Sequence, residues 1–544
     1  MKKIKIPGIL ILGLVPVFTH LLQLGKIARN FPLKDDYRVF VSYLYYYLNA
    51  PDKFAAITLP ENESHPVLMR LIVLFQCGVD GHQDFGHMLL LCNLFLAVFF
   101  TCLVVHFYTR KEYLPVAWVS LLVLNLVHYE MYFRNDVGAY QLLSFSFSVF
   151  LFYAAANYGR LGVLLRVLFF LIFVITPLGS INGIVANVLV VACFLVNKEN
   201  RKAGMVTALL LLIQLGLIVA GSGEGKSLNV FENIVKYNLQ LVYAYFLSMG
   251  GIFNLISNPY TWAVIAAVTA GIFGYTFYCL FLPWNRKLDF EKLLFLFCTI
   301  SLALIVGLRY NYWMQGYVSV LESRYKIYGA LIILLFFVTL MRRFGSVKWL
   351  GALVTVFLVA LFCGGFYKGQ TGLKFQQLEQ ITEAYNVYEG GYREDFARAF
   401  YINSEKKEFL EKEGIYSFKP ARTLFDAVLT EENRLREGVS GEMKPLEFDP
   451  TDAGDWGGMP AHVNMCNFKV TGHFPVKKYY FVKFRGDSTS CIQYLTPPPV
   501  SLLTRLGEEE EPVVPSLSRD FYPGAFTGID FSNFEIYGVD DLGL

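Results

Sequence analysis

The sequence is poor in charged residues. Only 17% of its 544 residues are Asp, Glu, Lys or Arg, whereas a soluble domain carries roughly 25%. The deficit is concentrated before Tyr367, where apolar runs follow one another with short polar breaks. Many of these runs reach or approach the roughly 20 residues that a bilayer-spanning helix needs. The shortage of charge therefore predicts a polytopic α-helical membrane protein.

Other absences exclude further classes. The net charge of +3 is too small to indicate nucleic-acid binding. No zinc pattern, dinucleotide fingerprint, nucleophile elbow or internal repeat is found. The run from Gly221 to Ser227 resembles a P-loop, but Ala220 occupies the position of its first glycine. No small-residue cleavage site follows the apolar run that begins at Ile6, so we read this run as an uncleaved first span.

The apolar runs and the placement of basic residues predict the topology. Each predicted inner segment carries at least two basic residues, so the N-terminus is placed inside and the C-terminus outside. The stretch 233–255 is interrupted by polar residues and a glycine pair, and we expect it to lie on or dip into the outer surface. The predicted spans are about 6–24, 86–108, 113–130, 137–157, 163–179, 182–197, 203–221, 259–283, 292–308, 326–341 and 348–367.

Two long segments therefore lie on the outer side, in a chain with a membrane domain (1–367) and an outer domain (368–544). The first outer segment is the loop 25–85, in which 38–48 and 66–77 are apolar but short and look like interfacial helices. The outer domain is expected to be α+β, helical over 371–440 and strand-rich over 441–544. The predicted strands are Lys477–Phe484, Cys491–Leu495 and Phe534–Val539.

Two features of the outer domain leave alternatives open. In an oxidising compartment Cys466 and Cys491 could form a disulfide, and two reduced buried cysteines fit the sequence as well. The aromatic residues of the strand-rich half would suit glycan binding, and the domain could equally cap an active site.

The strongest local signal is the adjacent pair Asp35 and Asp36, about ten residues beyond the first span. Two neighbouring carboxylates repel, which raises the pKa of one of them. A carboxylate near the membrane surface can then act as a general base. A solvated loop paired with Lys34 and Arg38 accounts for the same residues.

Two more outer segments carry polar groups of interest. Glu63 and His65 precede a helix and could contact a sugar or phosphate, although this segment also fits a plain helix cap. Glu130 and Asp136 flank membrane helices, where ionisable residues are functional candidates, and Arg134 could simply neutralise them.

A late outer loop gathers cations at the membrane face. Arg309, Arg324 and Lys326 lie around it, and arginine suits phosphate recognition. Tyrosines in the loop also fit ordinary interfacial anchoring. We expect Arg324 to bind phosphate.

Together these features resemble the GT-C class of membrane glycosyltransferases. The matching parts are the acidic pair after the first span, the long first loop with surface helices, the second acidic loop, the arginine-tyrosine motif before a late span, and the outer C-terminal domain. The segment from Asn62 to His65 with Arg70, and Ser323-Arg324-Tyr325, are similar to segments of uncharacterised bacterial members. The resemblance covers 1–367, through short, degenerate motifs.

The resemblance implies an inverting transfer of a sugar from a polyprenyl-phosphate carrier to a cell-envelope glycan or lipid. Asp35 or Asp36 would be the base, while Arg324, Arg309, Tyr325 and Lys326 would bind the lipid phosphate. Glu63, His65, Glu130 and Asp136 would supplement the site. The class admits a divalent metal, but the sequence shows no complete ligand set and implies no other cofactor.

The expected location is a bacterial inner membrane, with the N-terminus cytoplasmic and the C-terminal domain periplasmic or extracellular, surrounded by membrane lipids. Two alternatives stay open. An O-antigen polymerase or ligase also has many spans, but its long loop is expected late in the chain. A transporter usually shows inverted repeats and polar groups in the middle of its helices.

Overall fold

The structure is a computed structural model of the chain. It describes residues 6–33, 35–59, 66–197, 200–221, 230–255, 258–282, 287–310, 321–345, 347, 349–389, 404–435, 440–445, 466–475, 477–486, 490–496, 513–521, 529–540 and 542. The chain divides into two compact units. The helical unit comprises Met1–Ala28, Asp52–Val73 and Gly86–Leu373, and the mixed unit comprises Arg29–Pro51, Leu74–Phe85 and Lys374–Leu544.

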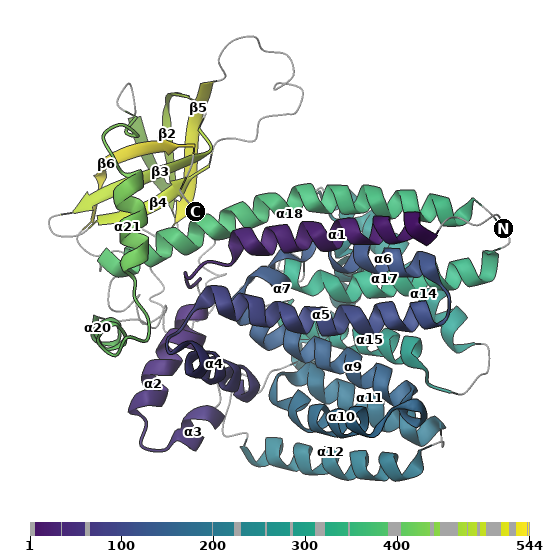
Figure 1. Ribbon diagram of the computed structural model, residues 1–544. Helices are drawn as coiled ribbons and strands as arrows, with labels where there is room; N and C mark the ends of the chain where they lie inside the picture. Colours follow the sequence, from purple (N-terminus) through teal and green to yellow (C-terminus); the bar gives the residue numbers. More distant parts are fainter. Residues whose placement is uncertain are drawn as a thin grey trace. The chain divides into compact units, whose positions relative to one another are not determined.

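The helical unit is a bundle whose long helices run alongside one another (Figure 1). Helix α11 packs against α9, α12 and α15, while α17 packs against α6, α14 and α15. The elements are α1 (Ile6–Ile27), α3 (Lys53–Thr58), α5 (Phe85–Thr109), α6 (Tyr113–Val123), η2 (Leu126–His128), α7 (Tyr129–Phe133), α8 (Asn135–Val137), η3 (Gly138–Leu142), α9 (Leu143–Ala156), η4 (Tyr158–Arg160), α10 (Val163–Ile175), η5 (Thr176–Leu178), α11 (Ile181–Asn197), α12 (Arg201–Gly221), α13 (Val230–Met249), η6 (Gly251–Phe253), α14 (Pro259–Phe281), α15 (Phe290–Arg309), η8 (Ser323–Tyr325) and α17 (Lys326–Phe344).

Two helices belong to both units. Helix α4 spans Val67–Asp80 and α18 spans Leu350–Glu389, and each crosses the boundary between the units without a break.

Many bundle helices are apolar on all sides. One face of each is buried against neighbouring helices, and the opposite face exposes large apolar residues. Leu164 and Leu209, for example, are 80% and 61% exposed. A helix that is apolar all round suits a bilayer rather than water. Within the described residues, six helices are long and apolar enough to cross a membrane, and each overlaps a predicted span. The chain is thus consistent with a multi-pass membrane protein, while the predicted count of eleven spans stays a prediction.

The predicted span 113–130 is broken. Helices α6 and η2–α7 are long and apolar enough to cross a membrane only when taken together, and they meet at a bend of 44°. Asn125 lies at the break, where its Oδ1 accepts a hydrogen bond from the backbone N–H of Val127 at 3.0 Å. The side chain thereby begins a new helical turn and redirects the chain.

The uncertain stretch 233–255 forms α13 and η6. Helix α13 is kinked at Tyr237 and packs against α14, α15 and α17. It ends before the pair Gly250 and Gly251.

The mixed unit joins parts of the first loop to the C-terminal region. Its loop elements are η1 (Tyr37–Ser42), α2 (Tyr43–Asn49) and the end of α4, which correspond to the short apolar stretches predicted as interfacial helices. Its C-terminal helices are α20 (Ser404–Lys412), α21 (Lys419–Val428) and the end of α18. The strands are β1 (Ser440–Pro445), β2 (Cys466–Pro475), β3 (Tyr479–Gly486), β4 (Ser490–Leu495), β5 (Val513–Phe521) and β6 (Ile529–Val539).

The strands form two antiparallel three-stranded sheets, ordered β1-β2-β5 and β4-β3-β6. One face of the second sheet packs on the first through residues such as Phe468 and Phe484. Its other face contributes Phe481 and Tyr494, which pack against α18 and α21. These four aromatic residues are buried, so they are not available for the glycan binding that the aromatics of this half would suit.

Candidate functional site

The acidic pair of the first loop has two different members. Asp36 is fully buried, and its Oδ2 accepts a hydrogen bond from the backbone N–H of Leu33 at 3.0 Å. This bond closes the turn that leads into the π-helix η1. The Asp35 side chain is 48% exposed and lies 3.8 Å from an Arg38 nitrogen. Asp35 therefore faces solvent, whereas Asp36 organises the backbone.

The C-terminal region packs directly on this turn within the mixed unit. The Tyr37 ring stacks on Phe418 at 6.3 Å, and the Tyr416 hydroxyl donates to the carbonyl of Asn30 at 3.0 Å. Burial, followed by the charges of Asp84 and Asp36, raises the pKa of Tyr416 well above its usual value. Tyr416 is therefore a neutral hydrogen-bond donor at physiological pH.

In the helical unit, the second acidic segment forms an ion-pair chain around Arg134. Its guanidinium binds Asp136 with two bonds of 2.8 and 3.1 Å, and its NH1 lies 3.7 Å from Glu130. Arg134 thus neutralises both predicted carboxylates in part, as the structural alternative supposed.

The Ser323-Arg324-Tyr325 segment, η8, is hydrogen-bonded to that acidic segment. The Ser323 hydroxyl donates to the carbonyl of Val127 at 2.9 Å and accepts from the backbone N–H of Glu130 at 3.1 Å. The backbone N–H of Arg324 donates to Glu130 Oε2 at 3.3 Å. The structure therefore brings together two segments that are far apart in the sequence, since Glu130 and Arg324 are separated by 194 positions.

The Arg324 side chain is held beside Tyr325 and Glu322. Its guanidinium lies 5.1 Å from the Tyr325 ring centre and forms an ion pair with Glu322. Burial raises the pKa of Glu322, although Arg324 and Arg309 act in the opposite direction. Arg309 ends α15 and contributes to this field. Glu63 and His65 lie outside the described residues.

Lys326, the first residue of α17, is only 6% exposed. Within the described part of the chain, no hydrogen bond or ion pair engages its ammonium group. Lys368 from α18 and Glu130 both act on it electrostatically. Lys368 itself donates to the carbonyl of Asn254 at 2.6 Å. A largely buried lysine next to a second cation, Lys368, favours an additional anion, so this end of the bundle is suited to one.

Close backbone contacts at glycines position these cations. A Cβ at Gly251 would lie 3.1 Å from Cγ of Lys326, so the glycine leaves room for the lysine stem. On α18, Gly365 and Gly369 approach Asn125 and the carbonyl of Leu126 so closely that a Cβ would overlap them. The glycines therefore bring α18, which carries Lys368, against the break between α6 and η2.

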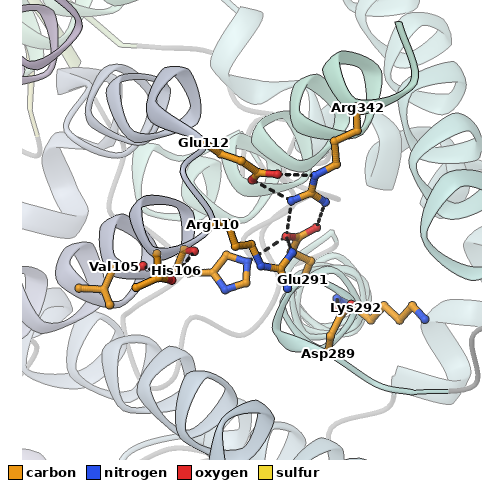
Figure 2. Close-up of polar contacts among 9 residues, drawn as sticks. Val105, His106, Arg110, Glu112, Asp289, Glu291, Lys292 and Arg342 are labelled. Atoms are coloured by element: carbon orange, nitrogen blue, oxygen red, sulfur yellow. Dashed lines mark hydrogen bonds and ion pairs between the residues drawn. The ribbon is translucent and has the colours of Figure 1, made fainter. Parts of the chain in front are cut away.

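A second charged cluster, which the sequence did not reveal as a site, lies at the other end of α17 (Figure 2). Glu291 of α15 is 1% exposed and accepts hydrogen bonds from His106 at 2.9 Å, Arg110 at 2.9 Å and Arg342 at 2.6 and 2.8 Å. Arg342 also binds Glu112 at 2.8 and 2.9 Å. Arg110 and Arg342 were visible in the sequence only as topology signals.

Two further predictions concern covalent and metal chemistry. Cys491 carries a free, buried thiol, and burial raises its pKa. The side chain of Cys466, its predicted disulfide partner, lies outside the described residues. Across the described residues, no group of three or more His, Cys, Asp or Glu side chains is arranged to hold a metal ion.

Comparison with known proteins adds no identification. No protein-family model, no curated protein and no solved structure matches the chain.

Proposed function

We propose that the chain is an inverting membrane glycosyltransferase of the GT-C type, which transfers a sugar from a polyprenyl-phosphate carrier to an envelope glycan or lipid. The observation that carries the proposal is the group of three cations at one end of the bundle, in which Lys326 is buried and Arg324 and Lys368 are half-buried. A lipid phosphate would give Lys326 the direct ion pair that it does not form with the described residues.

The chemistry asks little else of the protein. The anomeric C–O bond to the phosphate breaks, its electron pair stays on the phosphate, and an acceptor hydroxyl forms the new bond from the opposite face. The cations stabilise the charge that develops on the leaving phosphate. A base must take the acceptor's proton. We assign this role to Asp35, because its carboxylate is half exposed whereas that of Asp36 holds a turn.

One arrangement supports this assignment. Segments 29–51 and 74–85 of the first loop share a compact unit with the C-terminal region, so both belong on one side of a membrane. The resemblance to the GT-C class implies that the cationic group faces the same side. We infer that this side is periplasmic or extracellular and that the membrane is a bacterial inner membrane.

The local backbone also fits functional segments. Asp35 and Asp36 directly precede the π-helix η1, and Asp136 comes two residues before the π-helix η3. Short π-helical turns are rare and occur frequently at functional sites.

The test is transfer of a labelled sugar from polyprenyl-phosphate donors to envelope acceptors in membranes that contain the full chain. We expect Asp35→Asn to lower the transfer rate at least a hundredfold, because general-base catalysis contributes about 10²–10⁴-fold. Asp36→Asn keeps an oxygen that accepts from Leu33 and should retain most activity. Asp84→Asn, which changes a nearby carboxylate of the same unit, is the matched control. Undiminished transfer in Asp35→Asn and in the Asp35–Asp36 double variant would remove the proposed base.

A further inference from the structure

A buried histidine lies beside the cationic group. His128 ends η2 and is fully buried. Its Nε2 lies 3.0 Å from the carbonyl oxygen of Leu122. A carbonyl oxygen only accepts hydrogen bonds, so Nε2 must carry the proton and Nδ1 of the neutral ring must be a bare acceptor. No described residue is a hydrogen-bond partner of this Nδ1.

The neighbourhood of His128 is cationic. Lys326 acts on it electrostatically, and η2 packs against η8 and the start of α17. A largely buried lysine and a buried ring acceptor thus lie on neighbouring elements. The ring acceptor lacks a partner among the described residues, and these residues form no hydrogen bond or ion pair with the Lys326 ammonium. The charged or titratable groups near His128 on the elements packed around it include Tyr129, Glu130 and Tyr132 on α7, Arg324 and Tyr325 on η8, Lys326 and Tyr328 on α17, and Lys368 on α18.

The neighbouring groups do not fill this need themselves. Glu130 is engaged by the backbone of Arg324 and by Arg134. The Tyr132 hydroxyl donates to the carbonyl of Val123, so the ring lies against His128 without binding Nδ1. An unsatisfied buried polar group costs about 1–3 kcal/mol, which favours a ligand that both accepts from Lys326 and donates to His128.

We propose that Lys326 and His128 form a subsite selective for a phosphate that carries one proton. An ionised phosphate oxygen accepts from the Lys326 ammonium, and one proton lies between His128 Nδ1 and another phosphate oxygen, whichever atom holds it. This deepens and rests on the proposed function, because glycosyl transfer converts a phosphodiester, which has no such proton, into a phosphate monoester that can share one. The subsite therefore recognises the leaving phosphate.

The chemistry sets a discriminating comparison between two anions. A phosphate monoester has a second pKa near 6, and that of inorganic phosphate is higher, so both keep a proton on part of their population at neutral pH, whereas sulfate is fully ionised. Sulfate can satisfy Lys326 but offers nothing to the bare acceptor of His128. Both charge and shape are similar, so a preference for phosphate reports the shared proton.

The experiment measures binding of inorganic phosphate, sulfate, farnesyl phosphate and farnesol to the purified full chain in detergent by calorimetry. We expect phosphate to bind at least about tenfold more tightly than sulfate, the effect of one hydrogen bond to a charged group. Phosphate affinity should also rise from pH 8 to pH 6. If farnesyl phosphate binds more tightly than inorganic phosphate, the natural ligand is a lipid headgroup. If inorganic phosphate binds more tightly, the natural ligand is free phosphate. Either order supports the subsite, while farnesol should not bind.

Three variants locate the effect. His128→Gln keeps a donor toward Leu122 but cannot share a proton, so the preference over sulfate should fall to about twofold or less and the pH dependence should vanish. Lys326→Met should lose both anions. His20→Gln is the matched control, because His20 is another buried bundle histidine whose Nδ1 lacks a partner among the described residues, while its Nε2 binds Asn93. It should leave both affinities unchanged.

Equal affinity of the unaltered protein for phosphate and sulfate would falsify the subsite, as would an unchanged preference in a folded His128→Gln protein. Selective phosphate binding without sugar transfer keeps the subsite and removes the glycosyltransferase. Sugar transfer without selective phosphate binding keeps the glycosyltransferase and removes the subsite.

Discussion

The two ends of α17 carry charged clusters of opposite character. They are roughly 24 Å apart along the helix, at 1.5 Å for each of the 16 residues from Lys326 to Arg342. At the Arg342 end, the Glu291 cluster is closed, because the buried carboxylate accepts from His106, Arg110 and Arg342. At the Lys326 end, the Nδ1 of His128 is buried and has no partner among the described residues, and the largely buried Lys326 forms no hydrogen bond or ion pair with them. We infer from this difference that the Glu291 cluster joins helices, whereas the Lys326 end is suited to a ligand.

The closed cluster ties four segments of the bundle. His106 comes from α5, Glu112 precedes α6, Glu291 lies on α15 and Arg342 on α17 (Figure 2). Charges within a bilayer are tolerated when they pair with one another. Removing one member should therefore destabilise the bundle mainly because its charged partners stay in place without a counter-charge.

The largest effect is expected from opening the closed cluster. Glu291→Gln leaves Arg110 and Arg342 without the buried carboxylate, and the loss of one partner of a buried ion pair costs about 3–5 kcal/mol. We expect a large fall in the unfolding temperature of the full chain in detergent. Glu112→Gln should cost clearly less, because Arg342 keeps Glu291. Equal melting temperatures for Glu291→Gln and the unaltered protein would show that the cluster does not hold the bundle.

An opposite and smaller effect is expected at the open cluster. Lys326→Met removes a buried charge that has no partner among the described residues, so the ligand-free protein should gain about 1 kcal/mol of unfolding free energy. Phosphate at 100 times its dissociation constant should stabilise only the unaltered protein, by about 2.7 kcal/mol. Unfolding in detergent, with and without phosphate, measures both. A marked loss of stability in ligand-free Lys326→Met would make Lys326 structural.

The smallest effect on stability is expected at Glu535 in the mixed unit, a carboxylate that is also held by several partners. Glu535 of β6 binds Arg485, Tyr537 and Arg434. Burial alone would raise the pKa of Glu535, but the hydrogen bonds from Arg485 and Tyr537 outweigh it and lower the pKa. Arg485 is 51% exposed, so the pair is screened by water and contributes less than about 1 kcal/mol.

The sign of its pH dependence follows from linkage. A lowered folded-state pKa stabilises the sheet above the ordinary value of 4.5, and this contribution is lost as the pH falls through the folded-state pKa. Hydrogen exchange of the β3 and β6 amides against pH should show this loss. Glu535→Gln should flatten the profile, whereas Glu442→Gln, on an exposed site of β1, should not. An acid-induced loss that persists in Glu535→Gln would assign it to other groups.

The sequence by itself determined the apolar helices and several local segments. The shortage of charge and the run lengths located all six long apolar helices, since a bilayer sets both the polarity and the length of a span. Alternation and turn residues located β3, β4 and β6. Arg324 and Lys326 were singled out because they lie on the predicted outer face, where the positive-inside bias makes basic residues fewer.

Only the tertiary structure decided which of these residues meet. Lys368 and His128 lie in or beside apolar runs, and nothing local indicates that glycine contacts bring α18 against η2 beside Lys326. The Glu291 cluster joins residues that are up to 185 positions apart for reasons of packing. The different roles of Asp35 and Asp36 also depended on folding, because Asp36 is buried and accepts a backbone hydrogen bond, whereas its identical neighbour is half exposed.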